Sequence, residues 1–415
     1  MDNVISYINE HQRSDYQRVN FDSFLKKIKF SFNIPAIHVA GTNGKGSVCH
    51  YLANIYHKAG YRVGLFTSPS VISFNEVIKV NGEEIRDEEI KNFLEPHQKL
   101  IDKYDLSSFE ILAFVAFEHF KNQMCDIAII ECGMGGEEDA TNVFTPILSI
   151  ITSVSLEHTA YLGKSLSEIA TNKAGIIKRE VPVLIGELDE EATNAVVEVA
   201  KANKSKVYQV AKYSNAVLTN IGYKFDYTIY HNVTINSFAN YSVGNASIAL
   251  EATLILNDKF SVNIDNAKQV LLEPLLPGRL QYLSTKPLII VDGAHNPEAM
   301  EKLENSLEMI RKEKQIHIIF ASFRDKNIQK MLNILGLLSQ DIILTEFDHP
   351  RCRNKDEYFL FAEDYKFESD YLNAINSKIK EFPDDIILIT GSLAFAGRVI
   401  NDYKNGLIKY EDVQQ

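Results

Sequence analysis

A short segment of the chain combines the residue types that bind a polyphosphate. Residues 41–47, Gly-Thr-Asn-Gly-Lys-Gly-Ser, follow the strand pattern Ala36–Ala40 and precede an apolar-periodic helix that ends near Gly60. Glycines let consecutive backbone N–H groups turn toward an anion, and the helix N-terminus adds a partial positive charge. Lys45 can reach the β- and γ-phosphates, and the Ser47 hydroxyl can ligate Mg2+. Strand, glycine-rich loop, lysine, hydroxyl and helix in this order predict a P-loop.

Two further polar residues follow strand patterns at positions where ligands bind. Glu131 ends the buried run that begins at Asp126, and His158 comes shortly after the run Ile147–Thr152. The carboxyl ends of parallel strands face the ligand crevice of an open α/β sheet. We therefore predict that Glu131 binds Mg2+ in the manner of a Walker B acid, although a strand-end glutamate can also be a solvated cap. His158 is a candidate ligand whose alternative is an ordinary surface or core histidine.

Lys173 lies on the apolar face of a predicted helix, where burial of a charged lysine is energetically unfavourable. Ser165 and Glu168 form a capping-box pattern that opens a helix, and Lys173 falls on the same face as the apolar Leu166 and Ile169. A buried ammonium must be paired, discharged or modified. One solution is addition of CO2, which turns the amine into an anionic carbamate that can bind metal. The alternative is that the stem packs and the head reaches water.

The elements that must position these residues alternate along the chain. The predicted strands are short and apolar: residues 36–40, 62–66, 126–131, 147–152, 182–186, 287–292, 316–320, 341–345 and 385–390. The predicted helices between them are residues 47–59, 88–103, 109–121, 190–202, 298–312 and 369–380. Such alternation favours an α/β fold with parallel sheets that helices cover on both faces.

The length of 415 residues suits about two domains. Two prolines and a glycine in Glu273–Leu280 mark a junction near residues 275–285. We expect an ATP-binding domain over residues 1–280 and a C-terminal ligase domain over residues 281–415. Residues 213–236 fit irregular or antiparallel strands.

Composition excludes several classes of protein. The net charge of −12 argues against non-specific binding to nucleic acid or to an anionic membrane. The apolar runs are far shorter than the ~20 residues of a membrane helix, and the N-terminus lacks a secretory signal. The four cysteines (Cys49, Cys125, Cys132 and Cys352) show no metal-binding or disulfide spacing. We expect a cytoplasmic protein with free thiols, and a monomer.

Motifs across almost the whole chain resemble the folylpolyglutamate synthase/dihydrofolate synthase family of the Mur ligase superfamily. The matching segments, in order, are His38–Ser47, Ser68-Pro69, Phe74–Glu76, Phe109-Glu110, Glu131–Gly136, Asp139–Asn142, Lys173–Ile176, Pro277–Leu280, Asp292–Pro297 and Gly391–Leu393. The resemblance implies a P-loop-containing N-terminal domain of the Mur ligase central type with a parallel sheet. It also implies a smaller, Rossmann-like α/β C-terminal domain.

The resemblance assigns roles to residues that match the family pattern. ATP would be bound by Gly41, Thr42, Asn43, Gly44, Lys45, Gly46, Ser47, Asn245, Arg279 and Asp292. Two Mg2+ ions would be held by Ser47, Glu131, His158 and a carbamylated Lys173. The catalytic residues would be Lys45, Lys173 and His295. The pterin or folate pocket would include Ser68, Pro69, Phe109 and Asp139.

The chemistry that the resemblance implies is ATP-dependent amide formation. A folate or dihydropteroate carboxylate would attack the γ-phosphorus of ATP, and the amine of L-glutamate would then attack the resulting acyl phosphate. Two alternatives remain open: a Mur-type ligase with a non-folate acceptor, and a non-catalytic nucleotide-binding relative. The acceptor is the open point, because Val77 and Glu137 stand where the family commonly has arginines.

Overall fold

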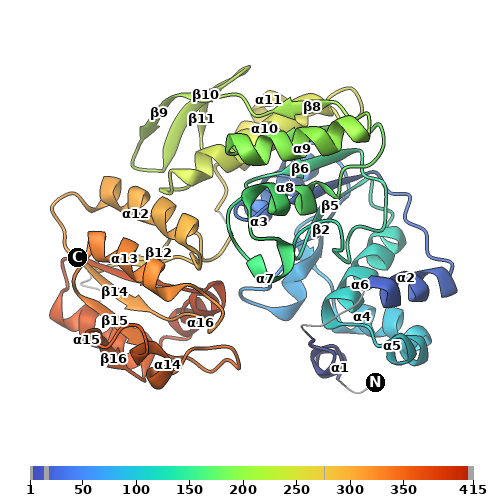
Figure 1. Ribbon diagram of the computed structural model, residues 1–415. Coiled ribbons are helices and arrows are strands. Elements are labelled where there is room, and N and C mark those ends of the chain that lie inside the picture. The colour runs from blue at the N-terminus through green and yellow to red at the C-terminus, as the bar shows by residue number, and fades with distance from the viewer. Residues whose placement is uncertain (1–2, 14–17, 275, 410–415) are drawn as a thin grey trace. The chain divides into compact units, whose positions relative to one another are not determined.

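The computed structural model describes residues 3–13, 18–274 and 276–409, and the chain divides into two compact units (Figure 1). Unit 1 lies within residues 1–216, 225–234 and 244–273, and unit 2 lies within residues 217–224, 235–243 and 274–415. Leu275, in the segment predicted to join the domains, lies outside the described residues.

An eight-stranded sheet forms the centre of unit 1, in the order β4-β3-β2-β5-β1-β6-β7-β8. The six strands β2, β5, β1, β6, β7 and β8 are parallel to one another. At one edge of the sheet, β3 pairs antiparallel with β2, and β4 pairs antiparallel with β3. The strands are β1 (Ala36–Ala40), β2 (Val63–Phe66), β3 (Ile78–Val80), β4 (Glu83–Glu84), β5 (Ile127–Glu131), β6 (Leu148–Ile151), β7 (Val183–Ile185) and β8 (Val207–Gln209). Every residue of β1, β5 and β6 is buried, as expected for parallel strands that are covered on both faces.

Helices cover both faces of this sheet. The glycine at the centre of β2, Gly64, faces Phe120 of α6, whereas Val63 and Leu65 on either side of it line a pocket with α3. Because successive residues of a strand point to opposite faces, α3 and α6 lie on opposite faces of β2. The helices of unit 1 are α1 (Val4–Glu10), α2 (Arg18–Lys27), α3 (Lys45–Lys58), α4 (Asp87–Leu94), α5 (Gln98–Tyr104), α6 (Ser108–Asn122), α7 (Thr159–Leu162), α8 (Leu166–Ala174), α9 (Glu190–Ala202) and α11 (Ile264–Val270).

The predicted helix over residues 88–103 is wrong as a single element. It is divided into α4 and α5 by a 3-10 turn, Glu95–His97, which contains Pro96. Proline has no backbone N–H and its ring clashes with the preceding turn, so an α-helix cannot continue through it undisturbed. The capping box predicted at Ser165 and Glu168 is confirmed at the start of α8.

Unit 2 contains a six-stranded sheet in the order β12-β13-β17-β14-β15-β16. The edge strand β12 (Gln281–Thr285) pairs antiparallel with β13 (Leu288–Val291), and the remaining pairs are parallel. The other strands are β14 (Ile316–Phe320), β15 (Ile342–Thr345), β16 (Lys366–Glu368) and β17 (Ile386–Thr390). The helices are α12 (Pro297–Arg311), α13 (Ile328–Leu338), α14 (Lys355–Phe359), α15 (Tyr371–Glu381) and α16 (Leu393–Lys404). The predicted α/β fold with two parallel-containing sheets is confirmed.

Residues 213–236 form a small sheet of β9 (Ser214–Leu218), β10 (Tyr223–Tyr227) and β11 (Tyr230–Thr234), and α10 (Tyr241–Ile255) follows it. None of the helices in the described part of the chain has the length and apolar character that crossing a membrane requires. The four cysteines are buried and free, as predicted.

Candidate functional site

The order of the strands brings the predicted site residues of unit 1 to one edge of the sheet. The neighbours β2, β5, β1 and β6 run parallel, so their carboxyl ends lie side by side. Ser68 and Pro69 follow β2, Glu131 ends β5, the P-loop follows β1, and His158 lies beyond β6. This is the edge at which open α/β sheets bind ligands.

The P-loop has the backbone conformation that its glycines permit. Gly44 is the N-cap of α3 and has a left-handed φ of 85°, which favours glycine. Lys45 folds back over the loop, and its Nζ donates hydrogen bonds to the carbonyls of Gly41 at 3.0 Å and Thr42 at 3.3 Å. The ammonium is therefore held at the mouth of the loop, beside the N-terminus of α3.

A polar segment after β6 fixes the P-loop, and it was not singled out from the sequence. Thr152 Oγ1 donates to the Asn43 carbonyl at 2.7 Å, and the Asn43 N–H donates to Ser153 Oγ at 2.9 Å. The Ser155 N–H in turn donates to Thr42 Oγ1 at 3.0 Å. The hydroxyls of Thr152 and Ser153, directly after the neighbouring strand β6, thus satisfy backbone groups of the loop and hold it in one conformation.

Asn245 of α10, a predicted nucleotide-binding residue, lies against the P-loop. A Cβ placed on Gly44 would lie 2.4 Å from Asn245 Oδ1. Only a residue without a side chain fits at position 44 while Asn245 keeps this position.

Glu131, at the end of β5, and Ser47, the last residue of the P-loop, are both buried. Glu131 is 4 % exposed and its Oε2 accepts a hydrogen bond from the Ser68 N–H at 3.1 Å, while Ser47 is 5 % exposed. The carboxylate thus links the end of β5 to the loop after β2, in which the Ser68–Pro69 peptide bond is cis.

The predicted substrate residues lie around the loop that follows β5. Phe109, on α6, packs so closely that a Cβ on Gly133 would lie 2.5 Å from its ring. Asp139 is buried, and its carboxylate accepts hydrogen bonds from the N–H groups of Met134 and Thr141, both at 2.9 Å. Burial raises the pKa of Asp139. Its carboxylate is therefore engaged within its own loop.

Lys173 is buried, so its head does not reach water as the alternative interpretation required. The residue is 3 % exposed on α8. Burial, together with the Lys45 ammonium, lowers the pKa of Lys173 to about 7, while Glu157 acts in the opposite direction. A substantial share of the amine is therefore neutral near neutral pH, and a neutral amine is the form that adds to CO2.

His158 is the N-cap of the short helix α7 and has a left-handed φ of 51°. Its ring remains 35 % exposed, with Nε2 4.0 Å from Glu157 Oε1. The imidazole is thus accessible near an acidic group that also influences Lys173.

The oxygen-bearing side chains near the P-loop suit Mg2+, which needs few protein ligands, better than a metal ion that is held entirely by protein side chains. Within the described residues, no three His, Cys, Asp or Glu side chains are grouped closely enough to hold a metal. Mg2+ takes one or two protein carboxylates, keeps several waters and shares the phosphates of its substrate. A hydroxyl such as Ser47 and a carboxylate such as Glu131 fit this requirement.

The remaining predicted ATP residues belong to unit 2. Asp292, at the end of β13, is 3 % exposed, and its carboxylate accepts hydrogen bonds from the Leu280 N–H at 2.7 Å and from Tyr241 Oη at 2.9 Å. Burial raises the pKa of Asp292, and the nearby Arg279 guanidinium partly offsets this. His295 places Nδ1 2.9 Å from the Gly293 carbonyl. Arg279, Asp292 and His295 are thus gathered at one end of β13.

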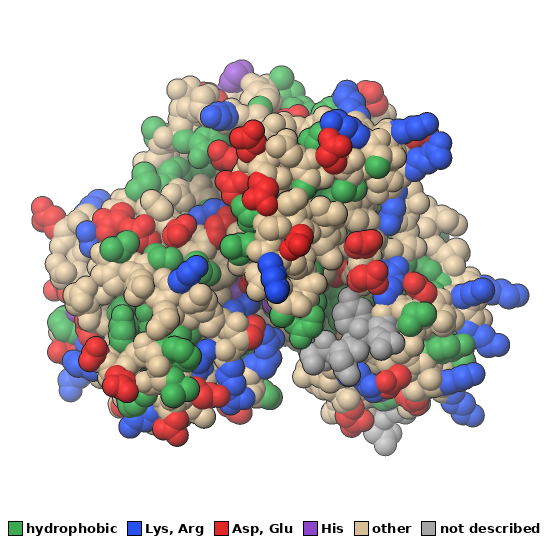
Figure 2. Space-filling view, viewed as in Figure 1, with side chains coloured by type: hydrophobic (Ala, Val, Ile, Leu, Met, Phe, Trp, Pro, Cys, Tyr) green, Lys and Arg blue, Asp and Glu red, His purple; other side chains and the backbone are tan. Residues whose placement is uncertain are grey.

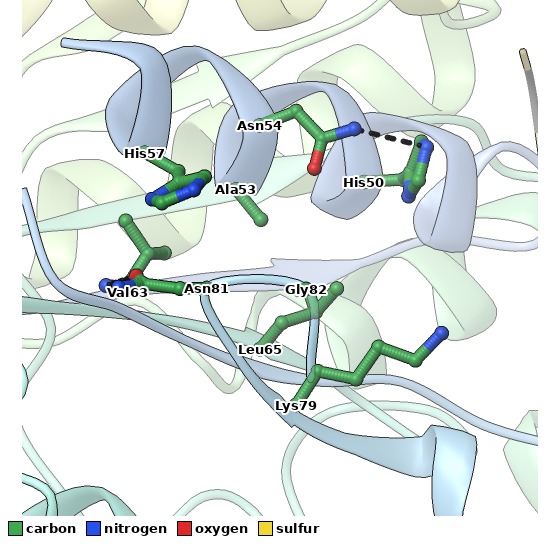
Figure 3. A pocket seen from close by; sticks show the side chains of 9 residues that line it. All are labelled: His50, Ala53, Asn54, His57, Val63, Leu65, Lys79, Asn81 and Gly82. Carbon is green, nitrogen blue, oxygen red and sulfur yellow. Dashed lines mark hydrogen bonds between the residues drawn. The ribbon is translucent and has the colours of Figure 1, made fainter. Parts of the chain in front are cut away.

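A separate pocket lies further along α3, away from the P-loop (Figure 3). His50, Asn54 and His57 line it from the helix, opposite Lys79 of β3. It includes none of the predicted nucleotide or metal residues.

Charged side chains of both signs lie across the face seen in Figure 2. On this one face, the mixture differs from the continuous basic surface that follows a nucleic-acid backbone.

Comparison with known proteins identifies the family of the chain. The Mur ligase middle domain model matches residues 39–253, and the Mur ligase glutamate ligase domain model matches residues 278–393. The chain is 33% identical to a dihydrofolate synthase/folylpolyglutamate synthase of Bacillus subtilis, over 87% of this chain and 89% of the relative. It is 31% identical to the folylpolyglutamate synthase of Lacticaseibacillus casei, over 88% of each.

A solved complex of a folylpolyglutamate synthase with AMPPCP and folate superimposes with a TM-score of 0.84. The two sequences are 27% identical, and the match covers 95% of this chain and 97% of that one. Two Mur ligase domains in order, and relatives that match along most of the chain, establish the family. The chain belongs to the folylpolyglutamate synthase/dihydrofolate synthase family of the Mur ligases.

Proposed function

We propose that this protein is an ATP-dependent ligase that joins L-glutamate to a folate-type carboxylate. The observation that carries the proposal is that a P-loop lysine and the buried acid Glu131 lie at one edge of the sheet in unit 1, and that the buried Lys173 is close enough to the Lys45 ammonium for its pKa to be lowered by it. The relatives named above are synthases of dihydrofolate or of folylpolyglutamate, and one related structure contains AMPPCP and folate.

The reaction proceeds in two steps. A carboxylate oxygen of the acceptor attacks the γ-phosphorus of ATP, the bond from this phosphorus to the bridging oxygen breaks, and ADP leaves. The amine of L-glutamate then attacks the acyl carbon, loses a proton, and phosphate departs from the tetrahedral intermediate. The product is an amide, and one oxygen of the phosphate comes from the acceptor carboxylate.

The residues of unit 1 mainly position groups and balance charge. The backbone of residues 41–47 and the Lys45 ammonium hold the phosphates, with Asn245 against the loop. Ser47, Glu131, His158 and Lys173 would hold Mg2+, two ions in all, which when bound neutralise charge on the transferring phosphoryl group. Neutral Lys173 adds to CO2 with loss of a proton, and the carbamate replaces a buried cation by an anionic ligand. Ser68, Pro69, Phe109 and Asp139 form the acceptor side.

The residues of unit 2 serve the nucleotide and the transferring group. Arg279 and Asp292 bind ATP, and His295 assists the phosphoryl transfer. We assign residues 1–280 to the ATP-binding domain and residues 281–415 to the ligase domain. We further propose that the enzyme acts in the cytoplasm as a monomer.

A coupled assay of ADP release tests the proposal. Purified protein is supplied with Mg2+, ATP and L-glutamate, and dihydropteroate and a reduced folate are offered separately. Turnover that needs an acceptor and is lost in Lys45→Ala supports the ligase, and the two acceptors show which of them Val77 and Glu137 permit. ATP binding without turnover on either acceptor would contradict the folate assignment.

A further inference from the structure

Three buried polar side chains connect β1 to the loop between β5 and β6. His38, on β1, places Nε2 2.8 Å from Thr141 Oγ1, and Thr141 Oγ1 also hydrogen-bonds to Asp139 Oδ1. His38 and Thr141 are fully buried, and Asp139 is 2 % exposed. We call these residues the His38 relay. The P-loop chemistry described above uses neither His38 nor Thr141.

The direction of the hydrogen bonds in the His38 relay follows from the donors around Asp139. The backbone N–H groups of Met134 and Thr141 both donate to this carboxylate, so it acts as an acceptor. The single hydroxyl hydrogen of Thr141 is therefore directed to Asp139, and Thr141 Oγ1 accepts from His38 Nε2–H.

The His38 ring has only one hydrogen to give. Burial, with Lys178 and Arg18 in the surroundings, lowers the pKa of His38 to about 3, so the ring is neutral at physiological pH. Its one N–H lies on Nε2, and the buried Nδ1 has no hydrogen-bond partner within the described structure. Nε2–H thus donates to Thr141 Oγ1, and Cys132 Sγ lies 3.1 Å from the same nitrogen as a weaker second acceptor. The side chain is a donor and does not act as a base.

The loop at the other end of the relay carries the acceptor side of the site. Gly133 packs on the Phe109 ring, and a Cβ on Gly136 would lie 2.6 Å from the Lys173 carbonyl. Arg18 stabilises the C-terminal end of this loop. Its Nη1 donates a hydrogen bond to the Asp139 carbonyl at 2.6 Å, and its Nη2 donates one to the Asn142 carbonyl at 3.0 Å. The conformation of residues 132–142 therefore decides how Phe109 and Gly133 meet.

We propose that His38 is a positioning residue for the acceptor. Acting through Thr141 and Asp139, it holds residues 132–142 in the conformation that packs on Phe109, and it thereby sets the affinity for the folate-type carboxylate. This inference rests on the proposed function, since it concerns the acceptor of that reaction. His38 itself touches no reacting group.

Four variants separate positioning from packing. His38→Phe keeps a ring of similar size beside Phe144 but removes the donor, whereas His38→Gln offers an amide N–H at a reach similar to that of Nε2. Thr141→Val removes the hydroxyl with little change of shape, and Thr141→Ser keeps it. Steady-state KM values for the acceptor and for ATP are measured on each full-length variant, with thermal stability as a control for folding.

The expected result is selective. His38→Phe and Thr141→Val raise the KM for the acceptor about tenfold, the size of effect that loss of one buried hydrogen bond produces, and leave the KM for ATP within about twofold. His38→Gln and Thr141→Ser restore most of the acceptor affinity. Because β1 leads directly into the P-loop, a general loss of packing at His38 would raise both KM values together, and that result would overturn the inference. Equal behaviour of His38→Gln and His38→Phe would overturn it as well.

Amide hydrogen exchange gives a readout that does not depend on turnover. His38→Phe and Thr141→Val should speed exchange in residues 133–142 and leave residues 41–47 unchanged. If wild-type protein shows no acceptor-dependent turnover but exchange changes in this way, the proposed function fails while the relay's control of the loop stands. If exchange in residues 133–142 is unchanged, the inference fails whatever the activity.

Discussion

Asn245 and Gly44 are in direct contact, although they lie far apart in the sequence. A Cβ on Gly44 would approach Asn245 Oδ1 to 2.4 Å, and Gly44 also has a left-handed φ of 85°. Position 44 is therefore restricted twice, by backbone conformation and by a neighbouring side chain.

Gly44→Ala should weaken nucleotide binding by at least about tenfold, because strain of about 1–2 kcal/mol from the left-handed backbone adds to the clash with Asn245. Gly60→Ala is the matched control, since Gly60 has a φ of 97° but no atom within 4 Å of its added Cβ. The control should lose stability and keep its affinity for ADP, measured by calorimetry. Equal affinities of the two variants for ADP would show that the contact with Asn245 is unimportant.

Lys173→Met should abolish turnover and yet stabilise the fold in CO2-depleted buffer at low pH. The pKa of this lysine falls from 10.5 to about 7 on folding, so between these pH values the unfolded chain binds a proton that the folded protein does not. Wild-type stability therefore rises with pH across this window, while the methionine variant lacks the dependence. We expect the variant to be more stable at pH 6 by more than about 1 kcal/mol, the lower end of the cost of an unpaired buried polar group.

Urea unfolding at several pH values measures this difference, with the exposed Lys201→Met as control. The advantage of Lys173→Met should shrink as pH rises from 7 toward 10. A difference that does not vary with pH would mean that Lys173 keeps its charge in the folded protein.

Glu131→Gln should raise the Mg2+ concentration needed for half-maximal ADP release by about tenfold or more, since the removed charge would face the cation. The amide can still accept the hydrogen bond from the Ser68 N–H, so the loop after β2 should stay in place. Glu137→Gln is the control, because Glu137 is an exposed acid in the neighbouring loop. An unchanged Mg2+ requirement in Glu131→Gln would remove this residue from the metal site.

Tyr241→Phe should destabilise the protein by about 1.5–3 kcal/mol, the contribution typical of a hydrogen bond to a charged group. The lost bond is the one from Tyr241 Oη to the buried Asp292 carboxylate. Tyr282→Phe is the control, because it keeps the ring that stacks on Phe238 at a centroid distance of 4.7 Å. Chemical denaturation measures the free energy of unfolding of both variants. Equal decreases in the two variants would show that the hydrogen bond to Asp292 does not add to stability.

Local patterns predicted the fold well. The strand that precedes the P-loop, the helix that follows it and the capping box of α8 all depend on residues that are neighbours in the sequence. The apolar stripe correctly placed Lys173 on the inward face of α8, but the stripe alone favoured a head that reaches water, and the structure buries it. The boundary between α4 and α5 at Pro96 was missed. The helical spacing of apolar residues continues across Pro96, although an α-helix backbone cannot accommodate a proline there.

Contacts between distant segments were not predictable in the same way. Thr152 and Ser153 fix the P-loop from another strand, Arg18 fastens the loop at Asp139, and Tyr241 reaches Asp292. Each contact joins segments that are separated by many residues, so the hydrophobic periodicity within one segment does not indicate it. The hydroxyl pair Thr152-Ser153, at the end of a predicted parallel strand, could have indicated this contact, but it was not singled out from the sequence.

The most direct test of the proposed ligase follows an oxygen atom. The acceptor is prepared with 18O in its carboxylate, incubated with the protein, ATP, Mg2+ and L-glutamate, and the released phosphate and the acceptor are examined by mass spectrometry. Label should pass to phosphate in step with the gain of one glutamyl residue by the acceptor, and Lys45→Ala should prevent both. Phosphate released without label, or an acceptor that gains no glutamate, would contradict ligation through an acyl phosphate.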